Sequence, residues 1–349
     1  MSALASGLMP ACYCQRPLPT LDLNIEFIDH AARLNELADQ WRKLWSVQTD
    51  ATPFQSPDWL LPWWDHYGEG PLFSFALWSK GELVGFAPLY IYKTADSCRR
   101  LFLLGTGNTD YLDAIFNPAF RKQCWQALMA EIQKRAVCWD ECNFQGLHSQ
   151  SPFLQETSVG PGFQIEMHQQ ALCPVLDLHA PNPARSMLKR TQYYSRKLRK
   201  MHQFRIEEAT EHSIDELFDA LERLHQDRWH AKGSAGVLAH KRDRSFHRQV
   251  ARRFLKANVL KLYGLRVEER IVAALYGFRH NSRTYFYLNG FDPEYGHLSV
   301  ASVLLGHAID QAIRDECHVF DFLKGQEPYK YRWGARDQAI FARNIRKNS

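Results

Sequence analysis

The fold is decided by the stretch LKLYGLRVEERIVAALYGFRH, which runs from residue 260 to residue 280. Apolar and aromatic residues dominate 260–267 and 271–280, and the charged triplet Glu268-Glu269-Arg270 separates the two runs. Two apolar runs of strand length around a short polar turn predict a β-hairpin.

The residues that follow this hairpin continue an α/β pattern. We expect a further strand at 284–289, a helix at 300–314 and another strand at 319–323. Within the predicted helix, apolar residues recur three or four positions apart, as one buried face requires. The second half of the chain therefore reads as hairpin, strand, helix, strand.

The first half repeats this order. Its predicted elements are a hairpin at 73–78 and 83–92, short strands at 101–104 and 113–116, a helix at 120–136 and a strand at 141–147. Each half also opens with helices, which we expect at 29–45 and 58–67 and again at 184–202, 213–232 and 243–257. An internal repeat of this size in 349 residues predicts two similar domains.

The segment between the repeats has few periodic apolar residues. Residues 149–162 are rich in Ser, Pro and Gly, so the junction should lie there or slightly later, near 174–183. We therefore predict a disordered leader at 1–20, an N-terminal domain at 21–170 and a C-terminal domain at 171–349.

Composition excludes several classes of protein. Hydrophobic residues make up 45% and charged residues 23%, which argues against disorder, and a net charge of +5 alone does not indicate nucleic-acid binding. The eight cysteines form no CxxC pair or zinc-finger spacing, so we expect reduced thiols, no metal site and a cytoplasmic protein. No run approaches the roughly 20 apolar residues of a membrane span. Metalloprotease, hydrolase, kinase and dinucleotide-binding motifs are not found in a suitable context.

Several short motifs together resemble one family. They are FDFLKGQEPYK at 320–330, LHQDRW at 224–229, GFDP at 290–293, DYLD at 110–113 and GFAPL at 85–89. The chain resembles the CelD-type acetyltransferases of the GNAT superfamily, which are linked to cellulose and exopolysaccharide synthesis and are related to the FemAB peptidyl transferases. The resemblance covers almost everything beyond about residue 21.

The resemblance implies both a fold and an activity. The implied fold is α/β, with two tandem GNAT-like (acyl-CoA N-acyltransferase) domains whose mixed, mostly antiparallel sheets are flanked by helices. The implied reaction moves an acyl group from acyl-CoA, such as acetyl-CoA, to an amino or hydroxyl group of a polysaccharide or cell-envelope precursor. Two alternatives stay open: a FemAB-like transferase that uses aminoacyl-tRNA, and a non-catalytic subunit of a polysaccharide-synthesis complex. DNA is not expected as a partner.

A donor site is implied where the strand at 284–289 leads into the helix at 300–314. In GNAT folds the pyrophosphate of the donor rests on backbone N–H groups at this junction, since a helix N-terminus carries partial positive charge. The residues expected there are Leu298, Ser299, Val300, Ala301 and Ser302. Relatives often have Pro-Gly where this chain has Ser-Val-Ala, so an ordinary helix cap is the alternative.

Tyr329 is the candidate acid. In GNAT enzymes a tyrosine beyond this strand often protonates the departing thiolate, and a phenol with a pKa near 10 suits a thiol with a pKa of about 8.5. If the segment is extended, Tyr329 and Tyr331 share a face and could replace one another. A solvated basic and aromatic turn is the alternative.

Three further ionisable residues surround this candidate. Asp321 lies in an otherwise apolar strand, so it is either a general base or half of a buried salt bridge to Lys330 or Arg228. Lys330 would hold phosphate or pair with Asp321. Glu327 is a second candidate base, with a solvated loop residue as the alternative.

The acceptor is expected in the groove between the domains. Arg196 and Arg199 share one face of a basic helix and would grip a phosphorylated substrate or tRNA, unless that face is simply solvated. The resemblance also implies that the helix carrying His225, Arg228 and Trp229 lines the acceptor groove.

Overall fold

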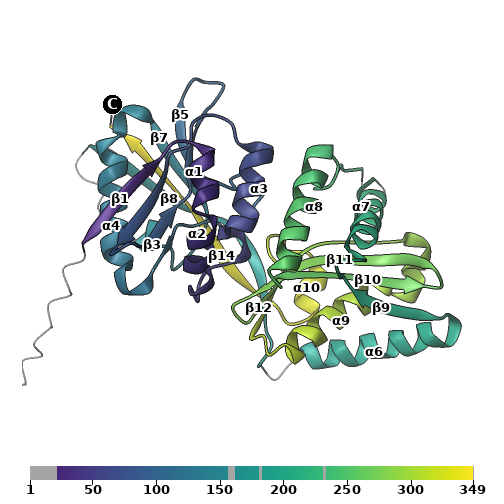
Figure 1. The fold of residues 1–349 in the computed structure, drawn as a ribbon. Coiled ribbons are helices and arrows are strands. Elements are labelled where there is room, and N and C mark those ends of the chain that lie inside the picture. Colours follow the sequence, from purple (N-terminus) through teal and green to yellow (C-terminus); the bar gives the residue numbers. More distant parts are fainter. Residues whose placement is uncertain (1–21, 156–161, 181–182, 231–232, 349) are drawn as a thin grey trace, which may run out of the picture.

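The computed structural model describes residues 22–155, 162–180, 183–230 and 233–348. They form two lobes side by side, one built mainly from each half of the chain (Figure 1). The predicted leader at 1–20 lies outside the described residues.

The first half begins with a strand and three helices and continues with a mainly stranded region. Its helices are α1 (Ala31–Glu36), α2 (Ala38–Ser46), α3 (Pro57–Tyr67), α4 (Arg121–Lys134) and α5 (Pro152–Gln155). Its strands are β1 (Leu23–Ile28), β2 (Ser74–Ser79), β3 (Glu82–Ala87), β4 (Leu89–Lys93), β5 (Arg99–Leu103), β6 (Ile115–Phe116), β7 (Glu141–His148) and β8 (Phe163–Asp177).

The second half repeats the pattern. Its helices are α6 (Pro183–Met201), α7 (Ile214–His230), α8 (Lys241–Lys256), α9 (Val300–Arg314) and α10 (Pro328–Arg332). Its strands are β9 (Phe204–Glu208), β10 (Leu260–Val267), β11 (Arg270–His280), β12 (Arg283–Phe291), β13 (Val319–Asp321) and β14 (Arg336–Lys347). The helix predicted at 300–314 is confirmed, as is the hairpin from which the prediction began.

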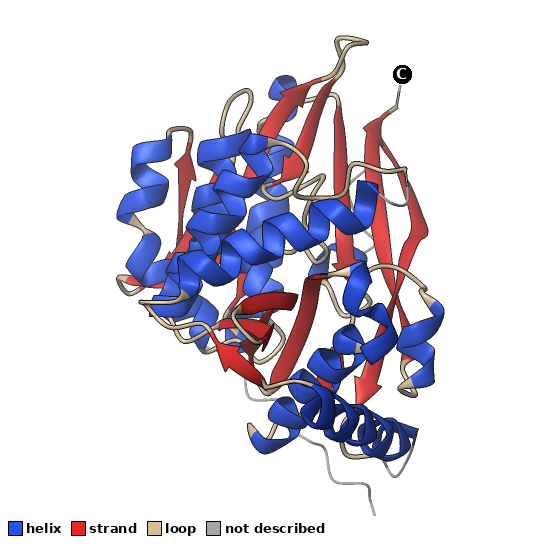
Figure 2. Cartoon of the chain, turned by 90° about the vertical axis from the view of Figure 1, so that its right-hand side faces the viewer, coloured by secondary structure: helices blue, strands red, loops and turns tan. Residues whose placement is uncertain are grey.

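The strands form two sheets. The smaller has the order β1-β2-β3-β6, and the larger has the order β4-β5-β7-β14-β8-β13-β12-β11-β10-β9. Most neighbours are antiparallel, but β5 with β7 and β12 with β13 are parallel. Figure 2 shows helices packed against the strands of both lobes. The predicted α/β fold with mixed sheets flanked by helices is confirmed.

The two halves exchange their last strands. β14, at the C-terminal end, lies between β7 and β8 in the first lobe, where the yellow arrow enters it in Figure 1. In return, Val175 to Asp177 of β8 pair with β13 of the second half. The predicted division between residues 170 and 171 falls inside β8 and stays a prediction.

Local sequence explains how the second lobe is held. Asn281 and Ser282 form the two-residue turn between β11 and β12, and both have positive φ (49° and 53°), as a tight hairpin turn requires. Gly290 lets α7 lie against β12, because a Cβ there would be 2.5 Å from the backbone nitrogen of His225. These contacts place β12 and α7 around the site described below.

An aromatic core joins the two lobes. Trp59 of α3 packs edge-on against Phe246 of α8 and Phe278 of β11, with ring centroids 5.1 and 5.7 Å apart. The α3 and α8 helices face each other across this interface (Figure 1). Large aromatic side chains contribute much of the buried apolar area at such contacts.

Candidate active site

A gap opens between two parallel strands of the second half. β12 and β13 pair at only three positions: Arg283 with Val319, Thr284 with Phe320 and Tyr285 with Asp321. β13 then ends, whereas β12 continues to Phe291. Within the described residues, the edge of β12 beyond Tyr285 therefore faces the gap without a neighbouring strand.

The first half has the corresponding parallel pair, β5 and β7, but its gap is closed. The pairing again covers three positions, from Arg100 to Phe102 on β5. Beyond them the chain itself enters the space, because Leu112 N–H donates to the carbonyl of Gly146 at 3.0 Å. An extended ligand can therefore hydrogen-bond more readily to the free edge of β12 than to the closed gap of the first half.

A cavity of about 150 Å³ occupies the open gap. It lies between the end of β12, the first turns of α9 and the short helix α10. Side chains from these elements and from α7 line it, including Arg228, Asn289, Ala301, Ser302, Tyr329 and Trp333. The structure thus brings four of the predicted site residues together, namely Arg228, Ala301, Ser302 and Tyr329.

The start of α9 presents backbone donors to this cavity. Val300, Ala301 and Ser302 form its first turn, whose N–H groups have no carbonyl four residues earlier within the helix. Ser299 precedes them with φ of 57° and makes no side-chain cap. Leu298 and Val300 point into the core instead, where both are almost fully buried. Small side chains and open N–H groups suit an anionic or amide-bearing donor.

Tyr329 is half-buried at the other side of the cavity. Its ring lies near Phe286 and Phe322, with centroids 6.5 and 6.3 Å away. Burial raises the pKa of this phenol above its usual value, so it stays protonated at neutral pH. Tyr331 is directed elsewhere, since its hydroxyl donates to Asp337 at 2.7 Å. The two phenols would share a face only in an extended segment, and α10 is helical here, so they do not.

Lys330 stabilises the loop before α10. Its side chain is buried, and its ammonium donates to the carbonyls of Lys324 (3.0 Å) and Gly325 (2.9 Å) and pairs with Glu327 at 2.9 Å. Of the two roles expected for Lys330, pairing with Asp321 is not seen, because these nearer acceptors take up the ammonium. Its expected contact with phosphate stays a prediction. Although partial burial raises the pKa of Glu327, the hydrogen bond from Lys330 lowers it overall. Glu327 is therefore a weak base held at the loop.

Asp321 joins the two halves. It is completely buried at the end of β13 and accepts hydrogen bonds from the Tyr111 hydroxyl (2.9 Å), the Arg283 guanidinium (3.0 Å) and the Leu323 N–H (2.8 Å). The expected salt bridge exists, but its partner is Arg283 and not Lys330 or Arg228. Asp321 does not line the donor cavity.

The residues expected to bind the acceptor are divided between two places. On α7, Arg228 donates to the Asn289 side chain at the cavity and lies over the Phe291 ring. His225 is buried beside it, and burial lowers its pKa, so the ring is neutral at pH 7. Trp229 has its ring centroid 5.9 Å from that of His225.

Arg196 and Arg199 lie on α6, outside the cavity. Both are exposed, and the guanidinium of Arg199 lies 5.4 Å from the centre of the Phe204 ring. Their helix crosses the lower edge of the second lobe in Figure 1. Any role for these two residues therefore involves a ligand that extends beyond this cavity or binds outside it.

Two residues near the gap were not singled out from the sequence. Lys324, just after β13, donates to the carbonyl of Thr109 (3.1 Å) and lies 3.7 Å from the Asp110 carboxylate. Burial raises the pKa of Asp110 to about 6, although Lys324 opposes the shift. Both residues lie inside motifs that carry the family resemblance, DYLD and FDFLKGQEPYK, and this is the signal that could have identified them.

Among the residues that the structure describes, no three His, Cys, Asp or Glu side chains are grouped as metal ligands would be. In the same part of the chain, every helix is too short or too polar to cross a bilayer.

Comparisons with known proteins agree on the fold. Residues 185–331 match a family model described as acetyltransferase (GNAT) domain, and no curated protein matches the chain. The crystal structure of FemX is similar over 87% of this chain and 95% of its own, with a TM-score of 0.60 and 10% identity. A conserved protein of unknown function from Bacteroides thetaiotaomicron has a TM-score of 0.57 at 13% identity, covering 93% of this chain and all of its own.

L-PGS from Bacillus licheniformis has a TM-score of 0.50 at 14% identity, covering 83% of this chain and 88% of its own. At these identities the structures show a common fold and nothing finer. The family match ends at residue 331, just after Tyr329, and so contains the gap, the start of α9 and most of α10. Residues 185–331 are thus similar to a GNAT acetyltransferase domain, and the chain as a whole has a two-lobed α/β fold similar to that of FemX.

Proposed function

We propose that this protein transfers an acyl group from acyl-CoA to an amine or hydroxyl at the gap between β12 and β13. One observation carries the proposal: the open gap of the second half holds a cavity that joins a free strand edge, a helix start and the Tyr329 phenol. The pantetheine arm would pair with the edge of β12, and the phosphates would lie over Ala301 and Ser302.

The chemistry needs a base, an acid and support for an oxyanion. The acceptor attacks the thioester carbonyl, and its proton passes to Asp110, whose pKa of about 6 suits a base at neutral pH. The carbon–sulfur bond then breaks, and Tyr329 donates its proton to the leaving thiolate. β12 bulges at Tyr287, because the pairing partners pass from Leu288 to Phe286. Such a bulge can direct a backbone N–H at the reacting carbonyl.

The finer identity of the substrates is also part of this proposal. A polysaccharide or cell-envelope precursor as acceptor is proposed from the CelD-type resemblance, as is a partnership with polysaccharide-synthesis machinery. A cytoplasmic location is proposed from the cysteine pattern. Acetyl-CoA is the donor to test first, because the matched domain is described as an acetyltransferase.

The test of this proposal is Tyr329→Phe, which keeps the ring and removes only the acidic proton. Since a positioned acid contributes roughly 10²- to 10⁴-fold in rate, we expect kcat to fall by a factor in that range with little change in acetyl-CoA affinity. Tyr331→Phe is the matched control and should retain activity, because its hydroxyl contacts Asp337. Unchanged kcat in Tyr329→Phe would show that the thiolate leaves without this acid. No turnover by the parent protein with any acyl-CoA would favour the non-catalytic alternative.

A second candidate function is aminoacyl transfer from tRNA. Its support is the exposed basic surface of α6 together with the fold shared with FemX. The exposed basic residues are Arg185, Lys189, Arg190, Arg196, Lys197, Arg199 and Lys200. A phosphate backbone would bind such a surface mainly through charge, so its affinity would fall steeply with salt.

The double substitution Arg196→Glu and Arg199→Glu tests this surface. If α6 grips tRNA or a phosphorylated acceptor, the KM for that substrate should rise about tenfold or more and depend less on salt, while acetyl-CoA affinity stays the same. Lys93→Glu with Lys122→Glu makes the same charge change at two exposed sites of the first half. Equal kinetics in both double variants would mean that the α6 surface is only solvated.

A further inference from the structure

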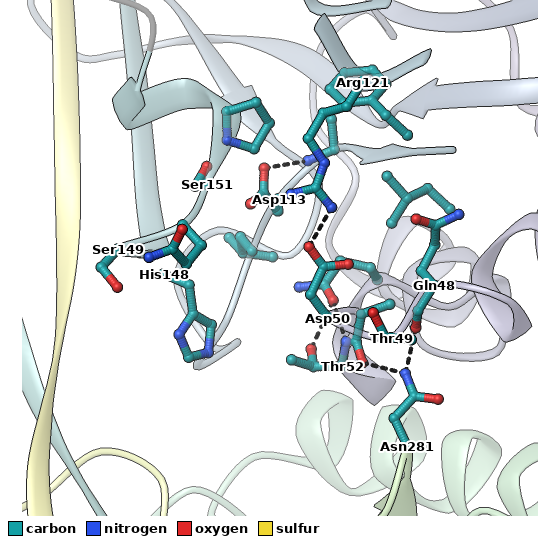
Figure 3. A pocket seen from close by; sticks show the side chains of 18 of the residues that line it. Gln48, Thr49, Asp50, Thr52, Asp113, Arg121, His148, Ser149, Ser151 and Asn281 are labelled. Atoms are coloured by element: carbon teal, nitrogen blue, oxygen red, sulfur yellow. Dashed lines mark hydrogen bonds and ion pairs between the residues drawn. The ribbon is translucent and has the colours of Figure 1, made fainter. Parts of the chain in front are cut away.

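A second cavity, of about 220 Å³, lies between the two halves. Figure 3 shows His148, Ser149 and Ser151 on one side of it, Gln48, Asp50 and Arg121 on the other, and Asn281 at its base. The first six belong to the first half, whereas Asn281 lies in the β11–β12 turn of the second. The Asn281 amide donates to the carbonyls of Gln48 and Ala51 and so ties the halves together at this point.

The charges around this cavity are balanced. Arg121 pairs with Asp50, and Arg283 pairs with Asp321. Asp113 has no ion pair with any residue that the structure describes, but burial raises its pKa to about 8, so it is mostly uncharged at pH 7. Burial also lowers the pKa of His148 and keeps its ring neutral. Among the described residues that line the cavity, none offers an unpaired formal charge to a ligand.

One buried side chain that lines the cavity, in contrast, lacks hydrogen-bond partners. Neither polar atom of the Gln48 amide has a partner among the described residues, although the residue is 1% exposed. Because a buried polar group without a partner is unfavourable, a ligand that hydrogen-bonds to this amide would be held.

We propose that this cavity binds an uncharged, polyhydroxylated ligand about the size of a single sugar ring. Hydroxyl groups both donate and accept, which matches a lining of amides, hydroxyls and paired charges. A charged ligand would lose its hydration without meeting an opposite charge. Pockets for drug-sized ligands run from roughly 300 to 1,000 Å³, so this one suits a smaller molecule.

The site is separate from the gap between β12 and β13. This cavity and the cavity at the gap have no lining residue in common, and neither Asp110 nor Lys324 lines this one. The inference therefore does not rest on the proposed acyl transfer. A ligand here would contact both halves at once, so binding should stabilise the whole protein.

The experiment is calorimetric titration of the full chain, without acyl donor, against four probes. D-glucose and N-acetylglucosamine are the uncharged probes, and glucuronate and glucosamine are their charged counterparts. Ser149→Trp fills the exposed mouth of the cavity, and Ser245→Trp makes the same change on the exposed surface of α8. Circular dichroism and thermal melting would verify that both variants fold.

We expect at least one uncharged sugar to bind, its charged counterpart to bind about tenfold or more weakly, and Ser149→Trp to weaken binding by a similar factor. Ser245→Trp should bind like the parent protein. The proposal is overturned if neither uncharged sugar binds, if the charged sugars bind equally well, or if the folded Ser149→Trp variant binds normally. None of these results depends on whether the protein transfers acyl groups.

Discussion

The buried ionisable side chains of this protein differ in whether they contact a group of opposite charge. Asp321 meets Arg283 and Tyr111, and Lys330 meets a cluster of carbonyls and Glu327. Asp113 accepts a hydrogen bond from the backbone N–H of Ala114 but forms no ion pair within the described part of the chain. A buried carboxyl group without a cation is stable only when it is protonated, and this makes the protein sensitive to pH.

Asp113→Asn should change how stability depends on pH. Burial raises the pKa of Asp113 to about 8 in the folded protein, against about 3.9 in the unfolded chain. Between these values the folded state binds more protons, so the free energy of unfolding falls as pH rises. Asparagine cannot ionise, so the Tm of Asp113→Asn should increase relative to the parent protein from pH 5 to pH 9.

Asp140→Asn is a control of opposite sign. The hydrogen bonds from Arg99 lower the pKa of Asp140 to about 2, so its stabilisation is present above about pH 4 and disappears as pH falls toward 2. This variant should be destabilised at pH 7 and approach the parent protein in acid. Parallel Tm curves for Asp113→Asn and the parent protein would contradict the buried, protonated carboxyl group.

The sequence indicated that Asp321 is either a general base or half of a buried salt bridge, and it did not identify the partner. An isolated carboxylate in an apolar strand shows the need for a cation, whereas the cation comes from Arg283, 38 residues away, and a further donor from Tyr111, 210 residues away. Asp110 and Lys324 were missed for the same reason, since their proximity depends on how the two halves pack.

The sequence predicted those secondary-structure elements that a local pattern of apolar residues determines. The second hairpin and α9 have apolar runs or a repeating apolar face, and both were predicted. β8 and β14 were not. β14 reads RDQAIFARNIRK, with charged residues at both ends, and becomes a strand because β7 and β8 lie on its two sides. Such pairing is a property of the assembled sheet and not of the segment.

Ala301→Asp tests the element that would hold the donor. Ala301 is the second residue of α9, where a carboxylate favours the helix itself, so folding should be preserved. The same carboxylate would repel phosphate at the cavity, and we expect acetyl-CoA affinity to fall about tenfold or more, which is at least about 1.4 kcal/mol. Calorimetry measures this directly.

The matched control is Ala32→Asp, which places the same residue at the second position of α1 in the first half. Ala32 is exposed and lies away from the cavity, so acetyl-CoA binding should not change. If both variants bind acetyl-CoA like the parent protein, the donor does not rest on the start of α9.

At the scale of the whole molecule, two features couple the lobes. β14 crosses into the first lobe, and the aromatic contacts of Trp59 join α3 to α8 and β11. The repeat in the sequence predicted two similar halves but not their exchange of strands, because the contact between Asn143 and Asn344 spans 201 residues. Two lobes that share strands should not unfold independently.

We therefore expect one calorimetric unfolding transition, with equal calorimetric and van't Hoff enthalpies. Leu128→Ala removes a fully buried side chain of the first half, and Ile309→Ala does the same in the second. Each should lower the free energy of unfolding by about 2–5 kcal/mol and shift the same single transition. Two separate transitions, each responding to only one of the substitutions, would show that the lobes are independent.

The position of β14 also sets an order of events during translation. Residues of β7 and β8 leave the ribosome long before Arg336 to Lys347, yet these last residues fill the place between them. Until β14 is synthesised, the facing edges of β7 and β8 therefore have no partner strand. Unpaired strand edges of this kind promote aggregation or bind chaperones. A ribosome that stalls before codon 336 would release a chain whose first lobe cannot close.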